Sequence, residues 1–281
     1  MTLYLVQSNI SGIYFRRERQ LVELMSEVIT ENFPQSNPDA STETPILSIV
    51  GANKRFGGLV AIKDLSFDIK PNEVVGLMGP NGAGKTTLIN LIYGVYKLDS
   101  GEIKFKGRSI VGLYPHKICQ LGIARTYQIP QPFTNLTALQ NIMVAGIYGR
   151  GMDRATAQKE AVRLIEFVGL SAKKDMMARD LEEVTLKRLE LARVLATKPT
   201  LLLIDEMAAG LTDSELPKVF SILKEIHQLG VTILLIEHVM RVMREAVDRI
   251  VVLESGTKIA EGSPENVMTD KKVIEAYLGT A

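Results

Sequence analysis

The sequence has few features that would place the protein in an oxidising compartment. It has one cysteine in 281 residues, Cys119, so an intrachain disulfide and a zinc site built from cysteines are both excluded. Its net charge is only +1, which gives no overall electrostatic reason to expect nucleic acid or an acidic membrane surface as a partner. The shortage of cysteine is consistent with a reducing compartment.

The sequence also lacks a long apolar run. A membrane-spanning helix needs roughly 20 consecutive apolar residues, and the longest uncharged stretch, residues 129–149, is interrupted by prolines, asparagines and glutamines. The first 15 residues lack the basic start of a signal peptide, since the basic cluster RRER follows them. We expect a cytoplasmic protein that is at most peripheral to a membrane.

The first 44 residues differ in composition from the rest. Residues 16–31 place apolar side chains at helical spacing on one face, which predicts an amphipathic helix. The stretch PQSNPDASTET that follows is rich in proline, serine and threonine and indicates a linker. We therefore predict an N-terminal extension over residues 1–44, whose role the sequence leaves open.

Residues 45–281 predict an α/β domain. The runs EVVGLM, TLLLID, VTILLI and RIVVLE are nearly continuous apolar segments, typical of strands buried on both faces. Helix-length segments separate the later strands, which indicates a parallel sheet covered by helices. We predict a core made of residues 45–128 and 198–281, and a helical subdomain at residues 129–197 inserted between them.

The segment GPNGAGKTT carries the clearest chemical signal. It has the spacing of a phosphate-binding loop, and it follows a predicted strand and precedes an apolar helix. Glycines let backbone amides turn toward phosphates, and the helix N-terminus adds partial positive charge. Lys85 is expected to reach the β- and γ-phosphates, and Thr86 to bind Mg²⁺. The predicted nucleotide-binding residues are Gly79, Pro80, Asn81, Gly82, Ala83, Gly84, Lys85, Thr86 and Thr87.

Two carboxylates complete this prediction. Asp205 ends the predicted buried strand LLLID, and Glu206 follows it directly. Asp205 suits a water-mediated contact to Mg²⁺, and Glu206 suits the orientation or deprotonation of an attacking water. Together with the loop, this pair predicts hydrolysis of a nucleoside triphosphate, with ATP and Mg²⁺ as cofactors.

From these motifs, residues 46–278 resemble the ATPase subunits of ATP-binding-cassette (ABC) transporters. The resemblance also rests on Gln128 in IARTYQ, on AAGLT after the carboxylate pair and on His238 in LLIEH. It implies a mainly parallel core with an antiparallel β subdomain and a helical insertion. It further implies that Gln128 contacts Mg²⁺, that His238 contacts the γ-phosphate, and that Phe56 in NKRFGG stacks on adenine.

Within that family, the sequence segments RLELAR, LLIEHVMR and IEAYLG are most similar to those of the ATPases of branched-chain amino-acid importers. That group of ATPases also serves amide and urea transport systems. The resemblance implies membrane permease subunits, a second ATPase and, indirectly, an extracytoplasmic solute-binding protein as partners. It also implies a position at the cytoplasmic face of the membrane. The segment IPQPFTNLTALQNI after Gln128 is expected to form much of the groove for the permease.

The family's Gly-rich signature is degenerate here. Glu182, Glu183 and Val184 occupy the positions of its serine and glycines, just before KRLELAR. We interpret Asp180 as the helix N-cap and Glu183 as its capping-box partner, with Val184 on the buried face. Carboxylates at this helix end would repel a phosphate, so we favour a heterodimer with an ATPase that has an intact signature.

Three other functions remain open at this stage. The runner-up is the ATPase of a lipid or lipopolysaccharide exporter, which has a similar cassette. A soluble ABC protein acting on nucleic acid fits less well, because the chain has one cassette, no heptad run and neutral charge. The third is a P-loop GTPase or small-molecule kinase. The GTPase is disfavoured because the only Asn-Lys pair, Asn53-Lys54, lacks the following aspartate that guanine recognition requires.

Overall fold

The computed structural model describes residues 44–208, 212 and 216–278. The amphipathic helix expected at residues 16–31 and its linker lie outside the described residues. The chain divides into residues 1–41 and residues 42–281, and the following description concerns the second unit alone.

A six-stranded sheet forms the centre of this unit, in the order β10-β9-β3-β8-β7-β6. Its strands pair in parallel except for β10, which runs antiparallel to β9 at one edge. The strands are β3 (Val74–Met78), β6 (Ile123–Arg125), β7 (Leu201–Asp205), β8 (Thr232–Ile236), β9 (Arg249–Glu254) and β10 (Thr257–Gly262).

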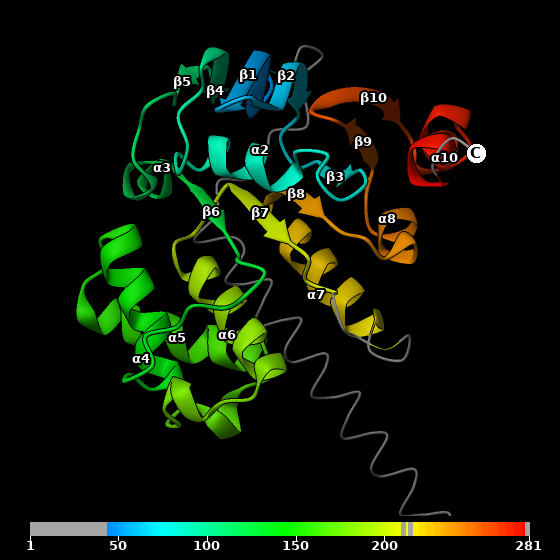
Figure 1. Ribbon diagram of the computed structural model, residues 1–281. Coiled ribbons are helices and arrows are strands. Elements are labelled where there is room, and N and C mark those ends of the chain that lie inside the picture. Colours follow the sequence, from blue (N-terminus) through cyan, green and yellow to red (C-terminus); the bar gives the residue numbers. More distant parts are fainter. Residues whose placement is uncertain (1–43, 209–211, 213–215, 279–281) are drawn as a thin grey trace, which may run out of the picture. The chain divides into compact units, whose positions relative to one another are not determined.

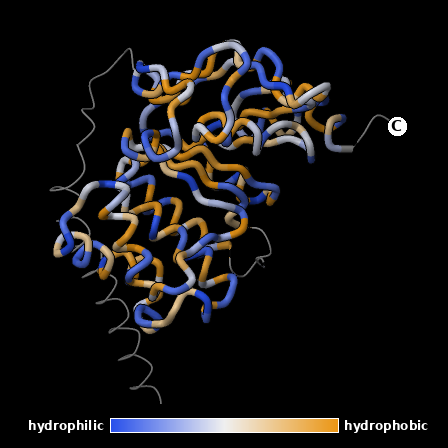
Figure 2. Tube along the Cα trace, turned by 60° about the vertical axis from the view of Figure 1, so that its left-hand side comes forward, coloured by the Kyte–Doolittle hydropathy of each residue, from blue (hydrophilic) through white to orange (hydrophobic). Residues whose placement is uncertain are grey.

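Helices cover both faces of this sheet, which is why its central strands are apolar throughout. Every residue of β3, β7 and β8 is buried. Alternate residues of β7 pack in opposite directions: Leu202 joins the hydrophobic cluster that contains α7 (Leu216–Gln228), and Leu203 joins the cluster that contains α2 (Lys85–Ile92). Figure 1 shows α2 and α7 on opposite sides of the strands, and Figure 2 shows the strands as the most hydrophobic part of the trace.

A second, antiparallel sheet has the order β2-β1-β4-β5. Its strands are β1 (Leu47–Phe56), β2 (Leu59–Ile69), β4 (Ser100–Phe105) and β5 (Arg108–Ser109). One face packs on the α2 side of the core through residues such as Leu47 and Ile49. The other face is open to solvent, so polar residues alternate with apolar ones along these strands. The strands are therefore longer than the apolar runs in their sequences.

The segment between β6 and β7 is helical. Its helices α4 (Ala138–Val144), α5 (Arg154–Phe167) and α6 (Glu183–Ala196) pack on one another and share the cluster that contains α7. A π-helical turn at Ala145–Gly149 follows α4, and short 3₁₀ turns at Ser171–Lys173 and Ala178–Asp180 precede α6. The capping box that starts α4 is formed by Thr137 and Gln140.

Four short helices complete the described part. They are α3 (Pro115–Leu121), α8 (Met240–Glu245), α9 (Pro264–Met268) and α10 (Lys271–Leu278). The α10 helix contacts the phosphate loop, because the Tyr277 hydroxyl accepts a hydrogen bond from the Gly79 N–H at 2.8 Å. Within the described ranges, no helix has the length and apolar character needed to cross a bilayer.

An ion-pair network joins the two sheets. The Arg249 guanidinium at the start of β9 donates to both carboxylate oxygens of Glu73, at 2.8 and 3.0 Å, and to the Asp68 carbonyl of β2 at 2.7 Å. Burial raises the pKa of Glu73, but the bonds from Arg249 and the Lys70 amide outweigh it, so the pKa lies below its ordinary value of 4.5. A carboxyl group whose pKa is lower in the folded than in the unfolded protein stabilises the fold at pH values above the unfolded-state pKa. This stabilisation is lost as the pH falls through the folded-state pKa.

We predict that Glu73→Gln lowers the free energy of unfolding by about 1–2 kcal/mol at pH 7, because a neutral amide replaces the charged acceptor of Arg249. The difference from wild type shrinks below pH 4.5 as the wild-type carboxylate takes up a proton. Urea unfolding at a series of pH values measures this. Glu102→Gln, in a more exposed pair with Lys104, should change stability little, and a Glu73→Gln penalty that stays constant into acid would contradict the assignment.

Candidate functional site

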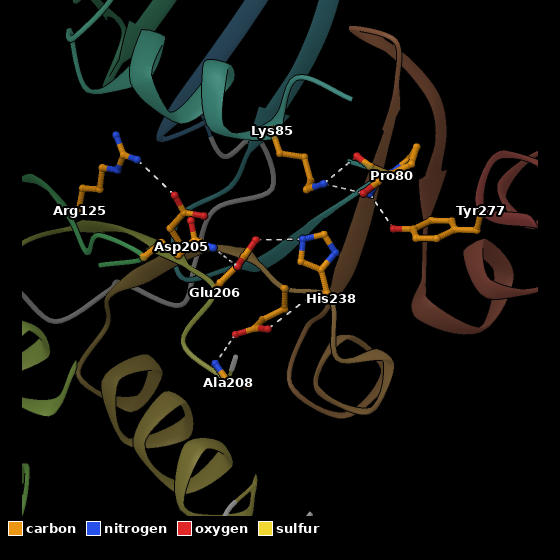
Figure 3. Close-up of polar contacts among 11 residues, drawn as sticks. Pro80, Lys85, Arg125, Asp205, Glu206, Ala208, His238 and Tyr277 are labelled. Carbon is orange, nitrogen blue, oxygen red and sulfur yellow. Dashed lines mark hydrogen bonds and ion pairs between the residues drawn. The ribbon is translucent and has the colours of Figure 1, made fainter. Parts of the chain in front are cut away.

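The predicted site residues meet at one edge of the central sheet because they follow parallel strands. The phosphate loop follows β3, Gln128 follows β6, Glu206 follows β7, and His238 follows β8. The carboxyl ends of parallel strands lie at the same edge of a sheet, and ligands bind there in open α/β sheets. Figure 3 shows the Lys85, Glu206 and His238 side chains converging at this edge.

Backbone geometry explains the glycines of the phosphate loop. Gly79 has φ 148° and Gly84 has φ 104°, a region that side chains disfavour. A Cβ on Gly79 would lie 2.1 Å from the Leu253 carbonyl oxygen, and one on Gly84 would lie 2.6 Å from the Ala61 carbonyl oxygen. The loop therefore threads between backbone carbonyls that leave no room for a side chain.

Lys85 lies at the end of this loop with 6% of its surface exposed. Its ammonium donates to the carbonyl oxygens of Gly79 at 2.6 Å and Pro80 at 3.0 Å. Burial lowers the pKa of Lys85, although the charges of Glu206 and Asp205 oppose this. The neighbouring Asn81, Gly82 and Thr86 are exposed, so the loop is open to solvent beside a buried cation.

Glu206 connects the other two predicted catalytic residues, Gln128 and His238. Its Oε2 accepts a hydrogen bond from Gln128 Nε2 at 2.6 Å, and its Oε1 lies 3.0 Å from His238 Nε2. The backbone of Glu206 has φ 52°, a left-handed conformation that is strained for a residue with a side chain. Residues separated by up to 110 positions are thus brought into one hydrogen-bonded group.

Asp205 is buried and paired with a residue that the motif analysis did not single out. Arg125 Nη2 donates to Asp205 Oδ2 at 3.2 Å, and the two side chains are only 5% and 6% exposed. The same guanidinium donates to the Asn90 side chain of α2. Burial raises the pKa of Asp205, and although Arg125 opposes this, the pKa remains above its ordinary value.

Glu237 is a second site residue absent from the sequence prediction. Its carboxylate is 1% exposed and accepts hydrogen bonds from the amides of Ala208 at 2.5 Å and His238 at 3.3 Å. Burial raises its pKa above the ordinary value. Glu237 therefore fixes the backbone near both Glu206 and His238. It follows an apolar strand directly, as Glu206 does, so the same sequence signal could have identified it.

Phe56 lies at the end of β1 and is 40% exposed. Its ring packs edge-on against Tyr96, with centroids 5.0 Å apart, and the Lys54 ammonium lies 5.3 Å from the ring centre. An exposed, laterally supported ring of this kind is available for stacking.

The helix α6 begins later than the sequence predicted. Glu182 is its N-cap and makes no side-chain capping bond, whereas Asp180 belongs to a 3₁₀ turn, so the predicted capping box is wrong. The reason is that Leu181 is extended and buried, which separates the turn from the helix. Val184 is 45% exposed, contrary to its predicted burial. Glu182 and Glu183 are 83% and 80% exposed, with Lys173 and Lys187 at 3.9 and 4.0 Å respectively.

Sequence comparison identifies the family. Residues 62–209 match the family model described as "ABC transporter". This chain belongs to the ABC transporter family, as an ATP-binding and ATP-hydrolysing subunit. Residues 257–281 match a second model, described as "Branched-chain amino acid ATP-binding cassette transporter".

Curated relatives agree with this membership. The chain is 36% identical over 252 residues to the high-affinity branched-chain amino acid transport ATP-binding protein LivG of Escherichia coli K12, covering 84% of this chain and 99% of the relative. The same values hold for BraF of Pseudomonas aeruginosa, which carries the same description. A probable LivG of Archaeoglobus fulgidus is 34% identical over 245 residues, covering 83% of this chain and 95% of the relative.

Solved structures of the family share the fold. A nucleotide-free ATP-binding cassette from an ABC transporter superimposes with a TM-score of 0.76 at 31% identity, covering 84% of this chain and all of that one. The ADP conformation of MJ1267, another such cassette, gives a TM-score of 0.75 at 31% identity with the same coverage. The predicted fold class and the resemblance to ABC ATPases are confirmed.

We predict that Arg125→Met lowers the free energy of unfolding by about 3–5 kcal/mol, because it leaves the buried Asp205 carboxylate without its cation. Adding Asp205→Asn to that variant should recover part of the loss. Urea unfolding without nucleotide measures both. Arg163→Met, in a partly exposed pair with Glu160, is the control and should cost less than about 1 kcal/mol. If the losses of unfolding free energy caused by Arg125→Met and by Asp205→Asn simply add in the double variant, the two side chains are not directly coupled.

Proposed function

We propose that this ATPase subunit powers the uptake of branched-chain or related hydrophobic amino acids through separate membrane permease subunits. The observation that carries the proposal is the match of residues 257–281 to the branched-chain amino acid transporter model, outside the nucleotide-binding region common to ABC proteins. Curated relatives at 33–36% identity have names of the same kind, so export of lipid is not favoured.

The phosphate loop is proposed to hold the triphosphate of ATP. Backbone amides of residues 79–87 and the Lys85 ammonium supply positive charge for it. In the described structure the ammonium is satisfied by two carbonyl oxygens, and phosphate oxygens would be stronger acceptors. Phe56 is proposed to stack on the adenine ring, with Tyr96 supporting its orientation.

The residues around the loop suit a magnesium ion bound with the nucleotide. The Thr86 hydroxyl, the Gln128 amide and the Asp205 carboxylate are oxygen donors, and Mg²⁺ prefers a few such ligands completed by waters and phosphates. When bound, this ion would neutralise phosphate charge. Arg125 occupies Asp205 Oδ2, which leaves Oδ1 to act toward the cation.

Hydrolysis is proposed to use Glu206 as the general base. Its carboxylate takes a proton from a water whose oxygen attacks the γ-phosphorus, and the products are ADP and inorganic phosphate. Gln128 and His238 each contact one oxygen of this carboxylate and so set its orientation. His238 is proposed to contact the γ-phosphate once nucleotide is present.

The remaining partners follow from the same proposal. We place the subunit at the cytoplasmic face of the membrane, paired with a second ATPase, bound to permeases and served indirectly by an extracytoplasmic solute-binding protein. No role in nucleic-acid binding is proposed. The role of the first 44 residues stays open, and the assignment of residues 129–197 as an inserted subdomain stays a proposal.

The acidic start of α6 supports a heterodimer. If this helix end faces the nucleotide of the second subunit, a carboxylate about 5 Å from a phosphate charge costs roughly 3 kcal/mol at an effective dielectric of ~20. The helix dipole returns only about 0.3–1 kcal/mol for carboxylates in the first turn. The site that contains Glu182 and Glu183 should therefore be weak, whereas Lys85, Asp205 and Glu206 serve a site completed by the partner's intact signature.

We predict that ATP-driven uptake of labelled leucine by the reconstituted transporter needs this chain, and that Glu206→Gln lowers ATP hydrolysis at least ~100-fold through loss of the general base. The equivalent change in the second ATPase should have little effect. Equal losses from both changes would reject the asymmetric dimer. Leucine uptake that continues without this chain would reject the proposed function.

The exposed ring of Phe133 gives a test of permease binding. Phe133 is 50% exposed within the segment predicted to form the permease groove, so Phe133→Asp should leave folding unchanged and weaken co-purification with the permeases about tenfold or more. Tyr148→Asp, at an exposed ring on the π-helical turn, is the matched control. Unchanged co-purification of Phe133→Asp would remove this segment from the interface.

A further inference from the structure

The stretch from Tyr127 to Thr137, here called the switch segment, joins the Gln128 position to α4 without forming a helix or a strand of its own. Several of its apolar side chains point to solvent: Ile129 is 74% exposed, Phe133 50% and Tyr127 40%. Such side chains bury little area, so hydrophobic packing contributes little to holding this backbone in place.

A buried carboxylate on α6 holds the segment instead. Glu190 is 4% exposed, and its two oxygens accept hydrogen bonds from the backbone amides of Tyr127 at 2.7 Å and Gln131 at 3.1 Å. Gln128 lies between these two amides in the chain. One side chain therefore fixes the backbone on both sides of the residue that contacts Glu206.

Two more polar side chains extend this anchoring. Arg193, one turn beyond Glu190, donates to the Gln131 carbonyl at 2.8 Å, and its guanidinium lies 5.4 Å from the centre of the Phe133 ring. Asn141 of α4 is fully buried and binds both the amide and the carbonyl of Phe133, at 2.8 and 3.1 Å. The segment is thus tied to α6 and α4 through its backbone.

A pocket open to solvent borders these contacts. It has a volume of about 160 Å³, and Tyr127, Gln131, Glu190 and Arg193 are among the residues that line it. On the side of this pocket the segment is not close-packed against the protein interior. The hydrogen bonds to Glu190, Arg193 and Asn141 therefore restrain the segment. Those to Glu190 also compensate its carboxylate, which would be costly to bury without them.

We propose that Glu190 is a positioning residue for ATP hydrolysis, acting through the Tyr127 and Gln131 amides to hold Gln128 against Glu206. This inference rests on the roles proposed above for Glu206 and Gln128, and it adds Glu190 as the residue that holds Gln128 in position.

Glu190→Gln tests the proposal in the assembled transporter. The glutamine has nearly the same volume, but its amide nitrogen cannot accept one of the two backbone bonds. The kcat for ATP should fall about tenfold, as expected for loss of a hydrogen bond to a charged group, while KM changes less than twofold because the phosphate loop is untouched. Glu166→Gln, an exposed carboxylate of α5, is the control and should match wild type.

Two further measurements separate positioning from a merely structural role. Backbone amides of Tyr127 and Gln131 should exchange hydrogen faster in Glu190→Gln, whereas amides of α5 should not. In a Gln128→Ala background, Glu190→Gln should lower kcat no further, because its effect passes through Gln128. The proposal is overturned if the fold-losses of kcat in Glu190→Gln and Gln128→Ala multiply in the double variant. It is also overturned if kcat in Glu190→Gln falls only in proportion to the fraction of unfolded protein.

Glu206→Gln is the reference variant that separates the proposed catalytic role of Glu206 from the proposed positioning role of Glu190. If it fails to lower hydrolysis, the proposed catalytic role of Glu206 is wrong. If it lowers hydrolysis while Glu190→Gln behaves like Glu166→Gln, the proposed function stands and only the positioning role of Glu190 is wrong.

Discussion

A buried ammonium constrains much of the site. Lys85 is 6% exposed, so its charge must be satisfied within the protein, and the carbonyls of Gly79 and Pro80 do this. Those carbonyls turn inward only because the loop adopts backbone conformations and close approaches that require glycine at positions 79 and 84. The negative charges of Asp205 and Glu206 favour the charged form of the same lysine. The loop, the lysine and the carboxylate pair therefore depend on one another.

The parallel sheet brings these groups together, and buried polar side chains set their final positions. Strands β3, β6, β7 and β8 all end at one edge, which accounts for the approximate meeting of the site residues. Arg125 then fixes Asp205, and Glu237 fixes the backbone next to His238. Glu190 fixes the segment that carries Gln128. Each of these three is at most 5% exposed and each is bonded, which is how proteins retain charges in their interiors.

The parts predictable from sequence are those with local signals. Continuous apolar runs predicted β3, β7, β8 and β9, and the phosphate loop was predicted from its spacing between an expected strand and an expected helix. The strand β6 has only three residues and exists through its pairing with β7, so no local pattern could reveal it. The start of α6 was predicted too early because burial of Leu181 in an extended conformation, a tertiary effect, overrides the capping signal at Asp180. The roles of Arg125 and Glu190 depend on partners 80 and 63 positions away.

The most direct test of the account is calorimetric titration of the purified chain with Mg-ATP, comparing wild type with Lys85→Ala. If Lys85 and the loop amides hold the triphosphate, wild type gives a saturable heat at one site, and Lys85→Ala weakens binding at least about tenfold, as expected for loss of a charge-assisted contact. Equal binding by the two proteins, or no heat from a folded wild-type chain, would contradict the central claim.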